Sequence, residues 1–118
     1  METTKLLEDF PKATIVIKQW FLDKLLESLK DDSVPENFKE FVRAQDMEND
    51  KIATMIKANP RVLFDVFDEY KIYIDISCLN DKFLWGINDD MRNSVYETRK
   101  EAEKAAIEQA FEILNNKL

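Results

Sequence analysis

The chain has 118 residues, a length that suits one domain with a single hydrophobic core. Hydrophobic residues make up 45% and charged residues 35%, a balance that excludes a disordered chain. The formal net charge is -7, so the average electrostatic field disfavours a nucleic-acid partner and an anionic membrane surface. No apolar run approaches the ~20 residues of a membrane helix, and we expect no membrane partner.

Several chemistries require residue types that the sequence nearly lacks. There is no histidine, and the single cysteine, Cys78, can form neither an internal disulfide nor a Cys/His zinc cluster. One glycine is too few for the familiar phosphate-binding loops. We therefore predict a protein that is not an enzyme and that uses no cofactor or metal. The acidic residues Glu2, Glu8 and Asp9 are unlike a secretory signal, which predicts a cytoplasmic location.

The first 70 residues carry helical patterns. Residues 1–12 predict a short lead-in that ends at Pro11. Between residues 14 and 29 the apolar residues recur at helical spacing, which predicts a well-buried helix. Its apolar stripe contains Ile15, Ile17, Trp20, Phe21, Leu22, Leu25, Leu26 and Leu29.

Three shorter helices should follow the first one. Ser33 and Glu36 form a capping box that predicts a helix ending near Gln45. A third helix should carry Ile52 and Ile56, and a fourth should begin after the break at residues 59–60. Residues 14–70 are thus predicted to be helical, with about four helices before the first strand.

Residues 71–97 change to an alternating pattern that predicts a three-stranded antiparallel β-meander. In the first strand Ile72, Ile74 and Ile76 should face the core, while Tyr73, Asp75 and Ser77 face away from it. Turn-forming residues 80–81 and 88–90 should connect this strand to a second through Phe83, Trp85 and Ile87, and that strand to a third through Val95 and Tyr96.

A last helix is predicted over residues 98–116. Thr98 and Glu101 form a second capping box at its start. Its buried face should consist of Ala102, Ala105, Ala106, Ala110, Ile113 and Leu114, with Ile107 and Phe111 at the margin. No linker or repeat divides the sequence, so the expected fold is a single α+β domain over residues 1–118, with the C-terminal helix packed on the sheet.

The C-terminal half is similar in its order of elements to the double-stranded RNA-binding domain. A helix, three antiparallel strands and a helix span residues 60–118, and the segment from Thr98 to Ala106 resembles the start of that family's final helix. Such domains place basic residues there to contact phosphates. The resemblance implies that Arg99, Lys100 and Lys104 would be the nucleic-acid contacts.

The segment from Trp85 to Leu114 also resembles the closing strand and helix of many small uncharacterised proteins. These proteins are encoded by phages and by mobile elements of gut bacteria. The resemblance implies no activity and no site residues, but it favours an accessory protein of bacterial or phage origin that binds another protein.

Three function classes remain open after these steps. The leading hypothesis is a non-enzymatic protein that binds another protein or its own copy, with Tyr73, Asp75 and Tyr96 as candidate contacts, because exposed aromatic anchors dominate binding energy. The alternative is nucleic-acid binding through Arg99, Lys100 and Lys104. A hydrolase based on carboxylates would need two acidic residues that converge in a deep pocket.

Overall fold

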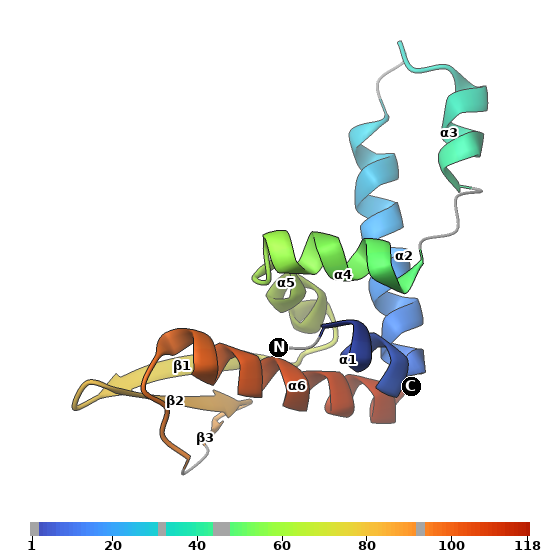
Figure 1. The fold of residues 1–118 in the computed structure, drawn as a ribbon. Helices are drawn as coiled ribbons and strands as arrows, with labels where there is room; N and C mark the ends of the chain where they lie inside the picture. Colours follow the sequence, from blue (N-terminus) through green and yellow to red (C-terminus); the bar gives the residue numbers. More distant parts are fainter. Residues whose placement is uncertain (1–2, 31–32, 44–47, 92–93) are drawn as a thin grey trace.

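The computed structural model describes residues 3–30, 33–43, 48–91 and 94–118. Within these ranges the chain forms six helices and a small antiparallel sheet (Figure 1). In chain order the elements are α1 (Thr3–Asp9), α2 (Pro11–Ser28), α3 (Glu36–Arg43), α4 (Asn49–Ala58), α5 (Val62–Glu69), β1 (Ile74–Leu79), β2 (Lys82–Ile87), β3 (Asp90–Met91) and α6 (Arg99–Lys117). The α+β class predicted from the sequence is therefore confirmed.

The prediction of about four N-terminal helices is wrong, because five helices precede the first strand. The lead-in over residues 1–12 contains the additional helix α1, which contacts α4 and α2. Seven residues are too few for a stable isolated helix. Burial of Leu6 and Leu7 in the core supplies the stability that its local sequence lacks.

The prediction of a three-stranded meander is also wrong. β1 and β2 pair over six residues each, whereas β3 has two residues, opposite Gly86 and Ile87. The predicted third strand at Val95 and Tyr96 is reduced to one bridge, in which Tyr96 and Phe83 exchange two backbone hydrogen bonds of 2.8 Å. The sequence of residues 90–94 contains one apolar residue, Met91, and so offers little apolar side chain for cross-strand packing.

Both predicted turns adopt the conformation that two-residue hairpins favour. Asn80 and Asp81 have φ values of 53° and 63°, and Asn88 and Asp89 have values of 52° and 68°. Left-handed φ at both central positions defines a type I′ turn, and asparagine and aspartate tolerate it better than other residues with a Cβ atom. This local chemistry sets the register of β1 on β2, from Ile74 opposite Ile87 to Leu79 opposite Lys82.

A left-handed residue, Lys71, joins α5 to the sheet. The N–H of Ile72 donates to the carbonyl of Phe67 at 2.9 Å, and the N–H of Lys71 donates to that of Asp68 at 3.0 Å. These two bonds form a Schellman motif, which satisfies the last carbonyls of the helix. Ile72 is then buried beside the helix that it terminates, and the chain leaves in the direction of β1.

The core lies where α6 crosses the inner face of the hairpin and meets α2 and α5. Ala102, Ala106 and Ala110 are fully buried, as the sequence predicts. Ile107 and Phe111, expected at the margin of this face, are also buried, because α5 and α2 cover that flank. Phe111 makes ring contacts with Phe67 at 5.8 Å and with Phe10 at 6.2 Å between centroids.

The start of α2 is fixed to the end of α6 by a long-range cap. The side-chain Oδ1 of Asn115 accepts hydrogen bonds from the backbone N–H groups of Lys12 at 2.9 Å and Ala13 at 3.2 Å. The residue before the helix, Phe10, has no side-chain acceptor to satisfy these donors. The side-chain amide of Asn115, 102 residues from Ala13 in the sequence, therefore takes the place of a local helix cap.

The second half of α2 projects from the rest of the molecule together with α3, and we call residues 22–30 and 33–43 the arm (Figure 1). The molecule measures 54 × 27 × 23 Å, and its radius of gyration of 16.3 Å exceeds the 13.5 Å or so expected for a compact chain of this length. The well-buried helix predicted over residues 14–29 is thus wrong for its second half, and also for Ile15 in the first half, which is 69% exposed. Leu25 is 41% exposed and Phe38 on α3 is 48% exposed. The predicted end of α3, near Gln45, lies outside the described residues.

Candidate functional site

A hollow of about 810 Å³ lies between the connection from α4 to α5 and the first half of α6. Its volume is about twice the 410 Å³ of a hollow between α1 and α6. We call it the basic groove, because five of its eleven lining residues are basic. The lining residues are Lys57, Ala58, Asn59, Pro60, Arg61, Arg99, Lys100, Glu101, Glu103, Lys104 and Ile107.

Two segments far apart in the sequence form the two walls of the basic groove. Residues 57–61 form one wall, where Asn59 and Pro60 separate α4 from α5. The first turns of α6 form the other wall. Residues Lys100, Lys104 and Ile107 recur at helical spacing and line the groove, while the neighbouring alanines are buried against the sheet.

The cap at Thr98 determines where this second wall begins. Thr98 is extended, and its Oγ1 accepts a hydrogen bond of 3.2 Å from the N–H of Glu101. The predicted capping position is therefore confirmed. The cap starts α6 at Arg99, so the positive end of the helix dipole lies beside the basic side chains of the groove.

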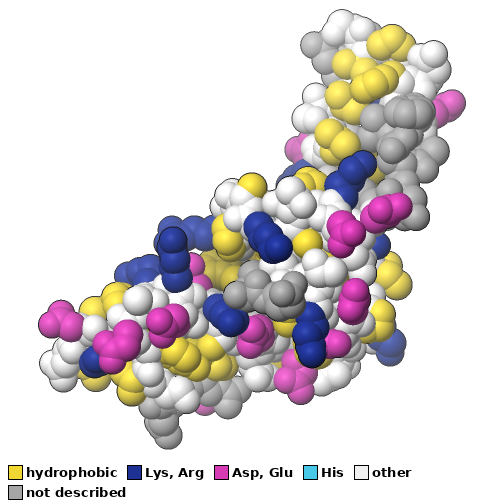
Figure 2. Space-filling model, in the orientation of Figure 1, with side chains coloured by type: hydrophobic (Ala, Val, Ile, Leu, Met, Phe, Trp, Pro, Cys, Tyr) yellow, Lys and Arg dark blue, Asp and Glu magenta, His cyan; other side chains and the backbone are white. Residues whose placement is uncertain are grey.

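The groove carries positive charge in a chain whose net charge is -7. Five basic residues and two acidic ones line it, which gives a local formal charge of +3. Figure 2 shows several dark blue side chains together above the first turns of α6, with magenta side chains next to them and both colours over the rest of this face. A charge of this sign in a hollow attracts anions.

One ion pair joins the two walls. Arg61 Nη2 lies 3.3 Å from Glu103 Oε1, and the Glu103 side chain is only 15% exposed. Arg99 lies with its guanidinium 5.4 Å from the centroid of the Phe83 ring, an arrangement typical of a cation–π contact. Among the residues that the structure describes, no carboxylate lies within ion-pair distance of Lys57, Lys100 or Lys104. These three ammonium groups remain available to an anionic ligand.

Three of the six predicted contact residues, Arg99, Lys100 and Lys104, come together in this groove. The other two basic residues of the groove, Lys57 and Arg61, were not predicted from the sequence. The two residues lie on either side of the break at residues 59–60, and their spacing of four is the only local signal that they share a surface. Their approach to α6 depends on tertiary packing.

The other three predicted residues lie elsewhere. Tyr73 is 51% exposed, and it shares with the exposed Asp75 the sheet face that α6 does not cover. Tyr96 is half-buried beside Phe83, on the sheet face that carries the core residues. Tyr73 is therefore exposed on the uncovered sheet face, whereas Tyr96 packs against the core.

No set of three or more acidic, cysteine or histidine side chains that could hold a metal occurs in the described ranges. Within those same ranges no helix combines the length and the apolar character that crossing a bilayer requires.

Comparison with known proteins gives no relative: no family model, no curated protein and no solved structure matches the chain. The resemblances to double-stranded RNA-binding domains and to phage or mobile-element proteins therefore stay predictions from sequence pattern.

Proposed function

We propose that the chain is a non-enzymatic binding protein whose basic groove holds the phosphate backbone of a nucleic acid. The observation that supports this proposal is the convergence of five cationic side chains from two separate segments on one hollow. Lysine and arginine contacts to phosphates supply most of the affinity in sequence-independent recognition. The net charge of -7 repels the same ligand from the remaining surface and so restricts binding to this face.

Each wall contributes contacts of a different kind. Lys100 and Lys104 are exposed and lie about 6 Å apart along the axis of α6, so they can meet two positions of one backbone. Lys57 approaches from the opposite wall. Arg61 lies on that wall too, where its guanidinium pairs with Glu103.

Salt dependence is the quantitative signature of this binding mode. Each phosphate that a cation neutralises lowers the logarithm of the binding constant by about 0.7 to 0.9 per tenfold rise in salt. Three to five contacts in the basic groove therefore predict a slope of roughly -2 to -4. A binding mode dominated by apolar contacts would give a slope near zero.

The test is a fluorescence-anisotropy titration against labelled duplex RNA, duplex DNA and single-stranded RNA between about 50 and 200 mM salt. The double charge reversal Lys100→Glu with Lys104→Glu should weaken binding at least about tenfold, because it removes two phosphate contacts and adds two repulsions. The matched control is Lys12→Glu with Lys51→Glu, which changes the net charge equally at exposed helical positions outside the groove. This control should have a much smaller effect.

Three results would contradict the proposal. One is that both double variants weaken binding equally, which would show a response to net charge alone. Another is that wild-type protein binds no nucleic acid at the lowest salt. The third is that it binds polyglutamate as tightly as nucleic acid and with the same slope, which would indicate an acidic protein segment as the ligand.

A further inference from the structure

Within the part of the chain that the structure describes, no strand lies beside the edge of β1 that faces away from β2. The sheet order is β1-β2-β3, so β1 pairs with β2 on one side only. The N–H of Asn88 donates to the carbonyl of Tyr73 at 2.9 Å, and Leu79 and Lys82 flank the two-residue turn. The backbone N–H and C=O groups of the odd-numbered residues from 73 to 79 therefore face β2. Those of Ile74, Ile76 and Cys78 point away from it, toward the free edge.

This edge lacks the features that usually protect a sheet from pairing with another chain. From Ile74 to Leu79 there is no proline and no lysine, and the one-to-one register with β2 leaves no room for a bulge. Asp75 is the only charged residue in the strand. Two large apolar side chains next to the edge, Tyr73 and Leu79, are 51% and 62% exposed.

We propose that β1 pairs antiparallel with β1 of a second copy of this chain, about a two-fold axis at Ile76. Ile76 then lies opposite Ile76 of the second copy, and Ile74 lies opposite Cys78. These are the residues whose backbone groups are free, and each opposed pair exchanges two hydrogen bonds. The two hairpins become one continuous sheet.

Side-chain chemistry selects this register. With the axis at Ile76, Tyr73 lies opposite Leu79, so the two exposed apolar side chains cover one another, and Asp75 lies opposite the hydroxyl of Ser77. The same register brings Lys71 toward the turn that contains Asp81 of the second copy, which places opposite charges near each other at both ends of the interface.

The neighbouring registers are worse on the same grounds. An axis at Asp75 places two carboxylates directly opposite each other, which is destabilising. An axis at Ser77 places Leu79 opposite Asp75 and Tyr73 opposite Asp81, so both exposed apolar side chains face carboxylates. The second copy is therefore complementary to the edge in one register.

Disulfide trapping tests the register directly. Tyr73→Cys and Leu79→Cys are combined with Cys78→Ser, so that the two new thiols are the only ones in the chain. The two positions lie about 20 Å apart along one strand, too far for a bridge within a chain. Mild oxidation should link most of the protein as dimers. The control pair Tyr73→Cys with Asp81→Cys, which matches the register centred on Ser77, should remain largely monomeric.

Sedimentation equilibrium tests the association without added cysteines. The wild-type chain should form dimers at high micromolar concentration. Dimerisation should strengthen with added salt, because two chains of charge -7 repel each other at low salt. Ser77→Asp, which faces Asp75 of the second copy, should weaken the dimer at least about tenfold, and Ser77→Lys should strengthen it.

Amide hydrogen exchange locates the interface. Protection of the amides of Ile74, Ile76 and Cys78 should rise with protein concentration, while that of Asp75 and Ser77 stays constant. The proposal is overturned if the wild-type chain remains monomeric or if the two cysteine pairs are trapped equally. It is also overturned if neither change at Ser77 alters the strength of dimerisation.

Discussion

The two halves of α2 have similar apolar content and opposite surroundings. In the first half Ala13, Ile17 and Phe21 are buried in the body of the molecule, which comprises α1, α4, α5, α6, the sheet and this half of α2. In the second half Leu25 is exposed and Leu22, Leu26 and Leu29 are half-buried, in the part of the helix that lies beside α3. Leucines at helical spacing therefore do not ensure burial, which depends on the elements that come to lie beside the helix.

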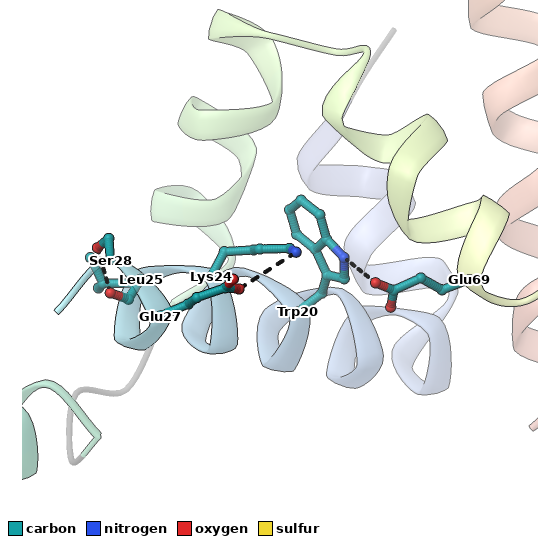
Figure 3. Close-up of polar contacts among 6 residues, drawn as sticks. All are labelled: Trp20, Lys24, Leu25, Glu27, Ser28 and Glu69. Atoms are coloured by element: carbon teal, nitrogen blue, oxygen red, sulfur yellow. Dashed lines mark hydrogen bonds and ion pairs between the residues drawn. The ribbon is translucent and has the colours of Figure 1, made fainter. Parts of the chain in front are cut away.

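Trp20 marks the boundary between these two halves. Its Nε1 donates a 3.2 Å hydrogen bond to Glu69 Oε1 at the end of α5, which ties α2 to the body. Beyond this residue the polar contacts become local: Lys24 lies 5.4 Å from the centroid of the Trp20 ring and 3.8 Å from Glu27 (Figure 3). Ser28 donates to the carbonyl of Leu25 at 2.6 Å within the same helix.

This difference has an energetic consequence. Helices of the body gain most of their stability from tertiary packing, whereas α3 has eight residues and touches only the end of α2 among its main contacts. Regions with few buried apolar contacts open at a lower free energy than the global transition. The arm should therefore open locally while the body stays folded.

The largest expected effect is that of Phe111→Ala in the body. The ring of Phe111 is fully buried and contacts Phe67 and Phe10, so its removal leaves a cavity at the meeting point of three helices. The free energy of unfolding should fall by about 3 to 5 kcal/mol. Urea denaturation followed by circular dichroism measures this loss, and a cost below about 1 kcal/mol would contradict the assignment of Phe111 to the core.

A smaller effect is expected from Asn115→Ala, which removes the cap that fixes the body half of α2 to α6. Two backbone donors, those of Lys12 and Ala13, lose their acceptor. The expected cost is about 1 to 2 kcal/mol in the free energy of unfolding. Asn116→Ala is the matched control, since Asn116 is exposed and makes no described side-chain hydrogen bond. Equal losses in the two variants would show that the cap contributes nothing.

The sequence predicts best those features that depend on interactions within a short segment. The cap at Thr98, the turns at residues 80–81 and 88–89 and the alanine face of α6 each depend on residues within a few positions, and the structure has all three. The failures involve distant partners. Apolar residues on several sides of α2 left its buried face undecided, and the acceptor for its first donors lies near the other end of the chain.

The same limit applies to the candidate site. Arg99, Lys100 and Lys104 were predicted because the start of α6 resembles the last helix of double-stranded RNA-binding domains. No local rule brings Lys57 and Arg61 to that helix. The convergence that supports the proposed function is therefore visible only after folding.

The smallest expected effect comes from Phe38→Ala in the arm, which makes the same chemical change as Phe111→Ala in the other region. Phe38 is 48% exposed, so little apolar area returns to water on truncation, and the global free energy of unfolding should change by no more than about 1 kcal/mol. The change should instead appear in amide hydrogen exchange, because α3 is expected to open locally while the body stays folded. Amides of α3 and of the last turn of α2 should lose protection, while those of α6 should not. If Phe38→Ala lowers the global stability as much as Phe111→Ala, the arm unfolds together with the body, and the boundary at Trp20 does not divide the molecule energetically.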